Sequence, residues 1–136
     1  RRKYLTIIND SKSTSFSSSI DLLKANNNIY WLLGGISKKG DKFDLSKKYF
    51  NNVKAFVYGK NKKFFNKKLK NKIVYKNFKS LKDAFKQILI IIKKEKIINK
   101  TILFSPSAAS FDSFKNFEDR GLYFSKLVKS YINEIK

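Results

Sequence analysis

Short apolar runs alternate with amphipathic segments along the whole chain. Runs rich in Ile, Val, Tyr and Phe, each bounded by turn-forming residues, predict strands at residues 4–8, 29–33, 53–58, 73–75 and 101–104. Strict alternation of strands with helices predicts an α/β fold built on an open, mostly parallel sheet with helices on both faces. A chain of 136 residues is long enough for one such domain and too short for two ordinary ones.

Amphipathic segments predict the helices between these strands. Residues 80–94 place apolar side chains at helical spacing, and the last segment does so from Phe124 to Ile135. Ser18 followed by Asp21 predicts a capped helix that ends near Ala25. Weaker helices are expected at residues 44–50 and 60–68, and Gly121 is expected to end a short helix before the long terminal one.

Composition excludes several classes of chemistry. The chain has no Cys and no His, which removes thiolate nucleophiles, imidazole bases and zinc sites with nitrogen or sulfur ligands. The net charge of +21 would favour a nucleic-acid partner, but lysines and other residues with A/T-rich codons dominate the whole sequence. The positive charges are scattered, and few are Arg, so we expect no nucleic-acid partner.

The ends of the chain and its apolar runs bear on its setting. The sequence begins at Arg1 and contains no Met, so we expect a segment of a longer polypeptide. The apolar run after Arg1 is too short for a signal peptide, and the run at residues 88–92 is far shorter than the roughly 20 residues of a membrane span. We therefore expect a cytoplasmic, monomeric protein with no membrane partner.

Three polar loops directly follow predicted strands, at residues 9–14, 34–40 and 105–110. Since parallel strands end on one rim of the sheet, these loops should converge there, where α/β proteins bind ligands. The first loop offers Asp10 for hydroxyl groups and Lys12 for an anion, and the second carries paired glycines with a nearby lysine. The third combines small residues with the Ser110 hydroxyl. Taken singly, each loop is also explained by an ordinary turn with solvated charges.

Together the loops resemble the Mur ligase family, and within it the members that add D-glutamate. The resemblance rests on Asn-Asp-Ser-Lys-Ser-Thr at residues 9–14 and Leu-Gly-Gly at 33–35. It rests most of all on Ser-Pro-Ser-Ala-Ala-Ser-Phe-Asp-Ser-Phe-Lys-Asn-Phe-Glu-Asp-Arg-Gly at 105–121. These motifs occur in the family's order and approximate spacing. The resemblance implies the Rossmann-like, three-layer C-terminal domain of these enzymes.

An ATP-dependent, ADP-forming amide ligase is the activity that this resemblance implies. Such an enzyme phosphorylates the carboxylate of UDP-N-acetylmuramoyl-L-alanine and lets the amine of D-glutamate attack the acyl phosphate, a step in peptidoglycan precursor synthesis. The UDP-binding domain and the central domain with the P-loop and Mg site would precede this chain, so residues 1–136 would be inactive alone. No catalytic or metal-binding residue is expected within them.

Individual roles follow the family's motifs. Asp10 would contact the ATP ribose, and Lys12 would contact the phosphate side of the nucleotide. The D-glutamate contacts would come from Thr14, Lys38, Ser110, Phe111 and the backbone of Phe117. An extra residue in the glycine loop leaves open whether Lys38 or Lys39 is the matching lysine.

Two other readings remain open at this point. One is a Mur ligase that adds a different amino acid, against which the motif at residues 105–121 argues. The other is a basic, non-enzymatic α/β module that binds nucleic acid, for which the net charge is the only support.

Overall fold

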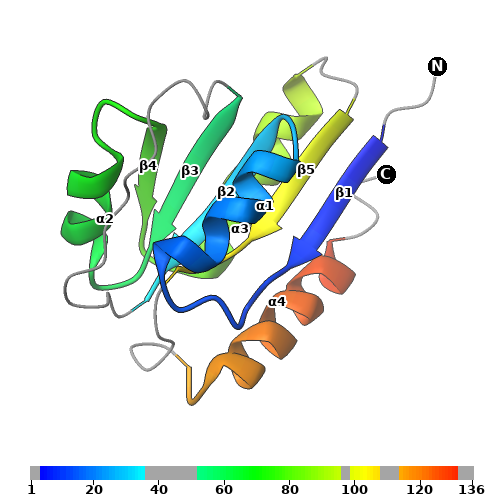
Figure 1. Cartoon of the computed structure of the whole chain (residues 1–136). Helices are drawn as coiled ribbons and strands as arrows, with labels where there is room; N and C mark the ends of the chain where they lie inside the picture. The colour runs from blue at the N-terminus through cyan, green and yellow to red at the C-terminus, as the bar shows by residue number, and fades with distance from the viewer. Residues whose placement is uncertain (1–3, 36–51, 96–98, 108–113, 132–136) are drawn as a thin grey trace.

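The computed structural model describes residues 4–35, 52–95, 99–107 and 114–131. They form one sheet of five strands, in the order β1-β5-β2-β3-β4, and every neighbouring pair is parallel. The strands are β1 (Tyr4–Asn9), β2 (Ile29–Gly34), β3 (Val53–Tyr58), β4 (Val74–Phe78) and β5 (Asn99–Phe104). All five arrows in Figure 1 point the same way, and the predicted open parallel sheet is confirmed.

Within the described residues, two helices cover each face of the sheet. They are α1 (Phe16–Ala25), α2 (Lys62–Leu69), α3 (Leu81–Lys94) and α4 (Phe117–Ser130). Alternate residues of β2 join opposite cores: Trp31 and Leu33 pack with α1 and α2, whereas Tyr30 and Leu32 pack with α3 and α4. β2 is therefore buried on both faces, which explains why its sequence is a continuous apolar run.

The start of α1 differs from its prediction. The helix begins at Phe16 with Ser15 as its N-cap residue, so the predicted start at Ser18 is wrong. Phe16 is fully buried, and its ring meets Trp31 edge-on with centroids 6.3 Å apart. Because this packing is with a distant strand, the local sequence does not indicate the two helical residues before Ser18.

Gly121 lies inside α4, so the prediction that it ends a short helix is wrong. A methyl group at this position would collide with the hydroxyl of Ser11 and come within 3.1 Å of its Cβ. Glycine therefore allows α4 to approach the loop after β1 closely. The helix begins four residues earlier, where the Asn116 side chain accepts a hydrogen bond from the Asp119 amide at 2.8 Å.

Smaller differences concern element ends. β4 runs from Val74 to Phe78 rather than over residues 73–75, and β5 starts two residues before its predicted beginning. The predicted helix at residues 44–50 lies outside the described residues. Within the described segments, no helix has the length and apolar character needed to cross a membrane.

Candidate functional site at the carboxyl ends of β1, β5 and β2

The three predicted loops follow strands that are neighbours in the sheet. The Asp10 amide donates to the Phe104 carbonyl at 2.7 Å, which joins the loop after β1 to the end of β5. The Gly34 amide donates to the Pro106 carbonyl at 3.0 Å, which joins the ends of β2 and β5. The predicted convergence is therefore confirmed for residues 10–14, 34–35 and 105–107.

Asp10 is held in one orientation by a neighbouring loop. Its Oδ2 accepts a hydrogen bond of 2.8 Å from the Ser105 hydroxyl, and Ser105 is fully buried. An ionised carboxylate offers about four acceptor positions, so this bond uses one of them. The side chain is half-buried, which suits a carboxylate that accepts hydroxyl groups from a ligand such as a ribose.

Lys12 and Thr14 are exposed on the same loop, and they alternate with buried residues. Ser13 and Ser15, on either side of Thr14, are 1% and 8% exposed. This alternation leaves the Thr14 hydroxyl and the Lys12 ammonium on the solvent side while the serines anchor the backbone. The loop therefore presents one cation and one hydroxyl beside the Asp10 carboxylate.

Arg120 anchors this loop from beneath. Its Nη2 donates to the Ser11 carbonyl at 2.6 Å and to the Ser13 carbonyl at 3.2 Å, and the side chain is only 1% exposed. Sequence reasoning saw only a charge within a motif and assigned it no role. A weak signal was available, because Arg120 is the one arginine outside the first two residues of a lysine-rich chain.

Asn9 and Gly121 add a second connection between the loop and α4. The Asn9 amide nitrogen donates to the Gly121 carbonyl at 3.0 Å and to the Ser125 hydroxyl at 3.1 Å. The other side-chain atom of Asn9, Oδ1, accepts from the Ser11 amide at 3.2 Å. α4 is therefore held against the loop that carries Asp10, Lys12 and Thr14.

Phe117 is the first residue of α4, and it is 44% exposed. Backbone amides in the first turn of a helix lack partners within the helix, and this end carries positive potential. The prediction that the Phe117 backbone meets a carboxylate is compatible with this position. The other predicted contacts, Lys38 with its alternative Lys39, Ser110 and Phe111, lie outside the described residues.

A cluster of buried serines joins the three loops below the exposed residues. Ser19 on α1 is fully buried, and its hydroxyl lies 2.9 Å from that of Ser13 and 2.6 Å from that of Ser107. Its hydroxyl also contacts that of Ser105. Sequence reasoning missed this cluster. The available signal was a serine between Phe16 and Leu23 on the apolar face of α1.

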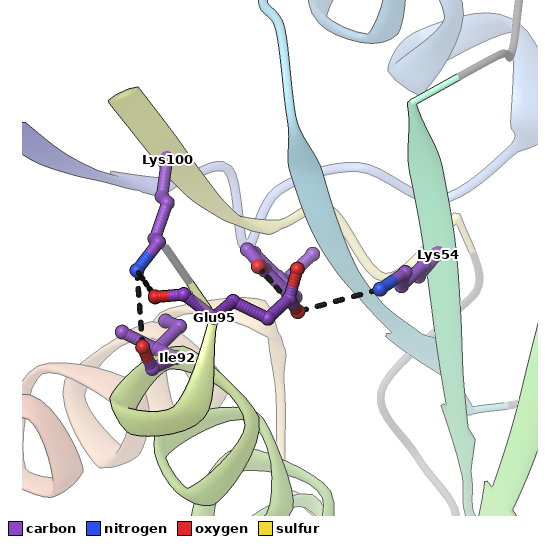
Figure 2. A network of polar contacts seen from close by, with 5 residues as sticks. Lys54, Ile92, Glu95 and Lys100 are labelled. Atoms are coloured by element: carbon purple, nitrogen blue, oxygen red, sulfur yellow. Dashed lines mark hydrogen bonds and ion pairs between the residues drawn. The ribbon is translucent and has the colours of Figure 1, made fainter. Parts of the chain in front are cut away.

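A different polar cluster lies at the opposite, amino ends of the strands (Figure 2). Lys100 donates to the carbonyls of Ile92 and Glu95, at 3.0 and 3.3 Å, where α3 ends. Glu95 Oε1 accepts from the Tyr30 hydroxyl at 2.9 Å and from Lys54 at 3.3 Å. Burial raises the pKa of Tyr30 far above its usual range, and the hydrogen bond to Glu95 and its charge add to this.

Metal ligands were not expected in this chain. Among the residues that the structure describes, no group of three or more acidic side chains is placed to hold a metal ion.

Comparison with known proteins identifies the family of the chain. No family model matches the chain. The UDP-N-acetylmuramoylalanine–D-glutamate ligase of Rickettsia felis is 41% identical over 128 residues, which cover 93% of this chain and 28% of that ligase. Proteins of the same name from Wolbachia of Brugia malayi and from Francisella philomiragia are 40% and 35% identical, over 90% and 91% of the chain. The chain belongs to this ligase family.

The match to these D-glutamate ligases covers their C-terminal part. The chain spans 24% to 30% of the length of the three relatives, so it matches only one portion of each of them. The resemblance inferred from the three loops is thereby confirmed at the level of the family.

Proposed function

We propose that this chain is the C-terminal, D-glutamate-holding part of an ATP-dependent ligase that joins D-glutamate to UDP-N-acetylmuramoyl-L-alanine. Homology to D-glutamate ligases over 90% or more of the chain is the observation that carries the proposal. The UDP-binding domain and the central domain, with its P-loop and magnesium site, belong to the same polypeptide. The isolated chain is inactive, and the whole enzyme works as a cytoplasmic monomer.

The chain contributes binding and orientation rather than proton transfer. Asp10 accepts hydroxyl groups of the ATP ribose, and Lys12 faces the phosphate side of the nucleotide. Thr14, Lys38, Ser110, Phe111 and the Phe117 amide surround D-glutamate. A dicarboxylate requires cations, hydroxyls and amide donors, and the loops at this rim offer these groups without histidine.

Orientation supplies most of the rate in such a reaction. The amine of D-glutamate has to reach the carbonyl carbon of the acyl phosphate. The C–N bond then forms in a tetrahedral intermediate, the nitrogen loses a proton to solvent, and phosphate leaves with the electrons of the C–O bond. Holding the two reactants in a fixed geometry corresponds to effective concentrations of about 10⁵ M or more. Closure of this domain over the ATP site of the central domain provides that geometry.

A kinetic experiment on the full-length polypeptide tests the proposal. Phosphate release is measured with ATP, Mg²⁺, UDP-N-acetylmuramoyl-L-alanine and D-glutamate. We expect Thr14→Val to raise the KM for D-glutamate about tenfold or more, since a hydrogen bond to a charged group contributes roughly 1.5–3 kcal/mol. The KM for ATP should stay within about twofold. Thr6→Val is the matched control, because Thr6 is an exposed residue of β1 away from the rim.

The same assay separates the alternatives. Phosphate release that depends on L-lysine or another amino acid instead of D-glutamate would assign the chain to a ligase of different specificity. Release that never depends on an amino acid, together with saturable DNA binding near physiological salt, would favour the basic nucleic-acid module.

A further inference from the structure

Ser19 is the only residue in the described segments whose side chain contacts all of Ser13, Ser105 and Ser107. It lies on α1, one turn inside the helix, and its side chain is fully buried. No ligand at the rim can touch it directly. Its hydroxyl nevertheless joins the loop after β1 to the loop after β5.

The number of hydroxyl protons limits which serine of this cluster can donate to which. A serine hydroxyl donates one hydrogen bond and accepts two. Ser105 uses its proton on the Asp10 carboxylate, which can only accept, so the Ser19 hydroxyl donates to Ser105. Ser19 then has two acceptor positions, which suit the hydroxyls of Ser13 and Ser107.

The distances support this direction. The Ser13 hydroxyl is 2.9 Å from Ser19 but 3.4 Å from its alternative acceptor, the Ser15 carbonyl. The Ser107 hydroxyl is 2.6 Å from Ser19 but 3.2 Å from the Ser105 carbonyl. The shorter distances favour an arrangement in which the hydroxyls of Ser13 and Ser107 donate to Ser19, Ser19 donates to Ser105 and Ser105 donates to Asp10, and such aligned hydrogen bonds polarise one another.

We propose that Ser19 is a positioning residue that aligns the loop after β1, which carries the nucleotide contacts and Thr14, with the loop after β5 through this directed chain of hydroxyls. Through Ser105 it sets the orientation of the Asp10 carboxylate. Through Ser13 it sets the backbone that presents Thr14, and the Ser107 amide, which donates to Ser13 Oγ at 3.1 Å, keeps the loop after β5 in register. The assignment rests on the proposed function for the identity of the two ligands.

Two substitutions in the full-length polypeptide distinguish the two branches of this series of hydroxyls, one through Ser105 to Asp10 and one through Ser13 to the backbone at Thr14. Ser19→Ala removes both branches, so the KM for ATP and the KM for D-glutamate should each rise about tenfold while kcat changes less than about threefold. Ser105→Ala removes the donor to Asp10 and one contact of Ser19 but keeps the contacts of Ser19 with Ser13 and Ser107, so the KM for ATP should rise and that for D-glutamate should not. In the double variant the KM for ATP should equal that of Ser19→Ala alone, because both changes break one chain.

Ile88→Val is the control for a general loss of packing. Ile88 is fully buried in the core between α3 and the sheet, away from the rim. We expect this substitution to leave both KM values unchanged. If Ile88→Val raised the two KM values as much as Ser19→Ala does, the role of Ser19 would be purely structural. If the increases in the KM for ATP caused by Ser19→Ala and Ser105→Ala multiplied in the double variant, the two residues would act independently, and the proposed series of hydrogen bonds would be wrong.

Amide hydrogen exchange tests the positioning role without turnover. Ser19→Ala should speed exchange at the Ser107 amide, whose hydrogen bond to Ser13 Oγ ties the two loops, and at the Ser13 amide, which donates to the Asp10 carbonyl within the loop after β1, more than at amides in β5. Unchanged protection at both sites would overturn the inference even if the wild-type enzyme is active. A wild type that shows no D-glutamate-dependent phosphate release overturns the proposed function, while faster exchange would still support the structural linkage.

Discussion

The two ends of the sheet each hold a buried cation that bonds to backbone carbonyls. At the carboxyl ends of the strands, Arg120 donates to the carbonyls of Ser11 and Ser13. At the amino ends, Lys100 donates to the carbonyls of Ile92 and Glu95, as Figure 2 shows. Arg120 is 1% exposed and Lys100 is 6% exposed, so the two residues are buried to nearly the same degree.

Arg120 and Lys100 bind different kinds of backbone. The last carbonyls of a helix are left without partners by helix geometry, and the negative end of the helix attracts a cation, so Lys100 reinforces an end that α3 has already formed. The loop after β1 has no regular structure of its own, and one nitrogen of Arg120 reaches two of its carbonyls. We infer that the cation at the amino end contributes stability, whereas the one at the carboxyl end also determines the shape of a binding loop.

Replacing Arg120 should have the largest effect. Arg120→Met keeps an apolar stem but leaves two loop carbonyls without their charged donor, so we expect a loss of about 3 kcal/mol in the free energy of unfolding. Urea denaturation of residues 1–136 at pH 7 measures it. In the full-length polypeptide the KM for D-glutamate should rise at least tenfold, because Thr14 belongs to the same loop. A normal KM would contradict the role of Arg120 in shaping the loop.

Replacing Lys100 should cost less and leave binding intact. Lys100→Met removes a donor from carbonyls at a helix end, and we expect a loss of about 1–2 kcal/mol in the free energy of unfolding. The same urea measurement compares it directly with Arg120→Met. The KM values for ATP and D-glutamate should remain those of the wild type. A tenfold change in either would mean that the two ends of the sheet are not separable in this way.

The sequence predicted the fold better than it predicted helix ends. β3 has its predicted bounds and α3 ends where expected, because apolar spacing and turn residues are local signals. The start of α1 and the course of α4 through Gly121 were missed because each depends on a distant partner. Trp31 buries Phe16, and Ser11 occupies the space beside Gly121.

The site divides in the same way. The rule that parallel strands end on one rim correctly brought the described parts of the three loops together. The supporting residues were not predictable, because their partners are far away in the chain. Arg120 bonds to Ser11 across 109 residues, and Ser19 contacts Ser105 across 86. The sequence around a buried serine or arginine does not indicate which distant residue is its hydrogen-bond partner.

Tyr30 offers the smallest effect and the sharpest test of the amino end. Tyr30→Phe removes the hydrogen bond to Glu95 and should lower the free energy of unfolding at pH 7 by about 1 kcal/mol. Burial, the hydrogen bond to Glu95 and its charge all raise the pKa of Tyr30, so the folded protein keeps this proton above pH 10. The unfolded chain, with an ordinary pKa near 10, releases it there.

Wild-type stability is therefore fully present below about pH 10 and falls above it, by at most about 1.4 kcal/mol per pH unit from this group. Tyr30→Phe lacks this loss, so its deficit relative to the wild type should shrink between pH 10 and 11. Urea denaturation of both proteins at pH 7, 9 and 11 measures the difference, and the titration of lysines common to both cancels. If the deficit in the free energy of unfolding stayed constant across this range, Tyr30 would ionise equally easily in the folded and unfolded states. The hydrogen bond to Glu95 would then not retain the Tyr30 proton.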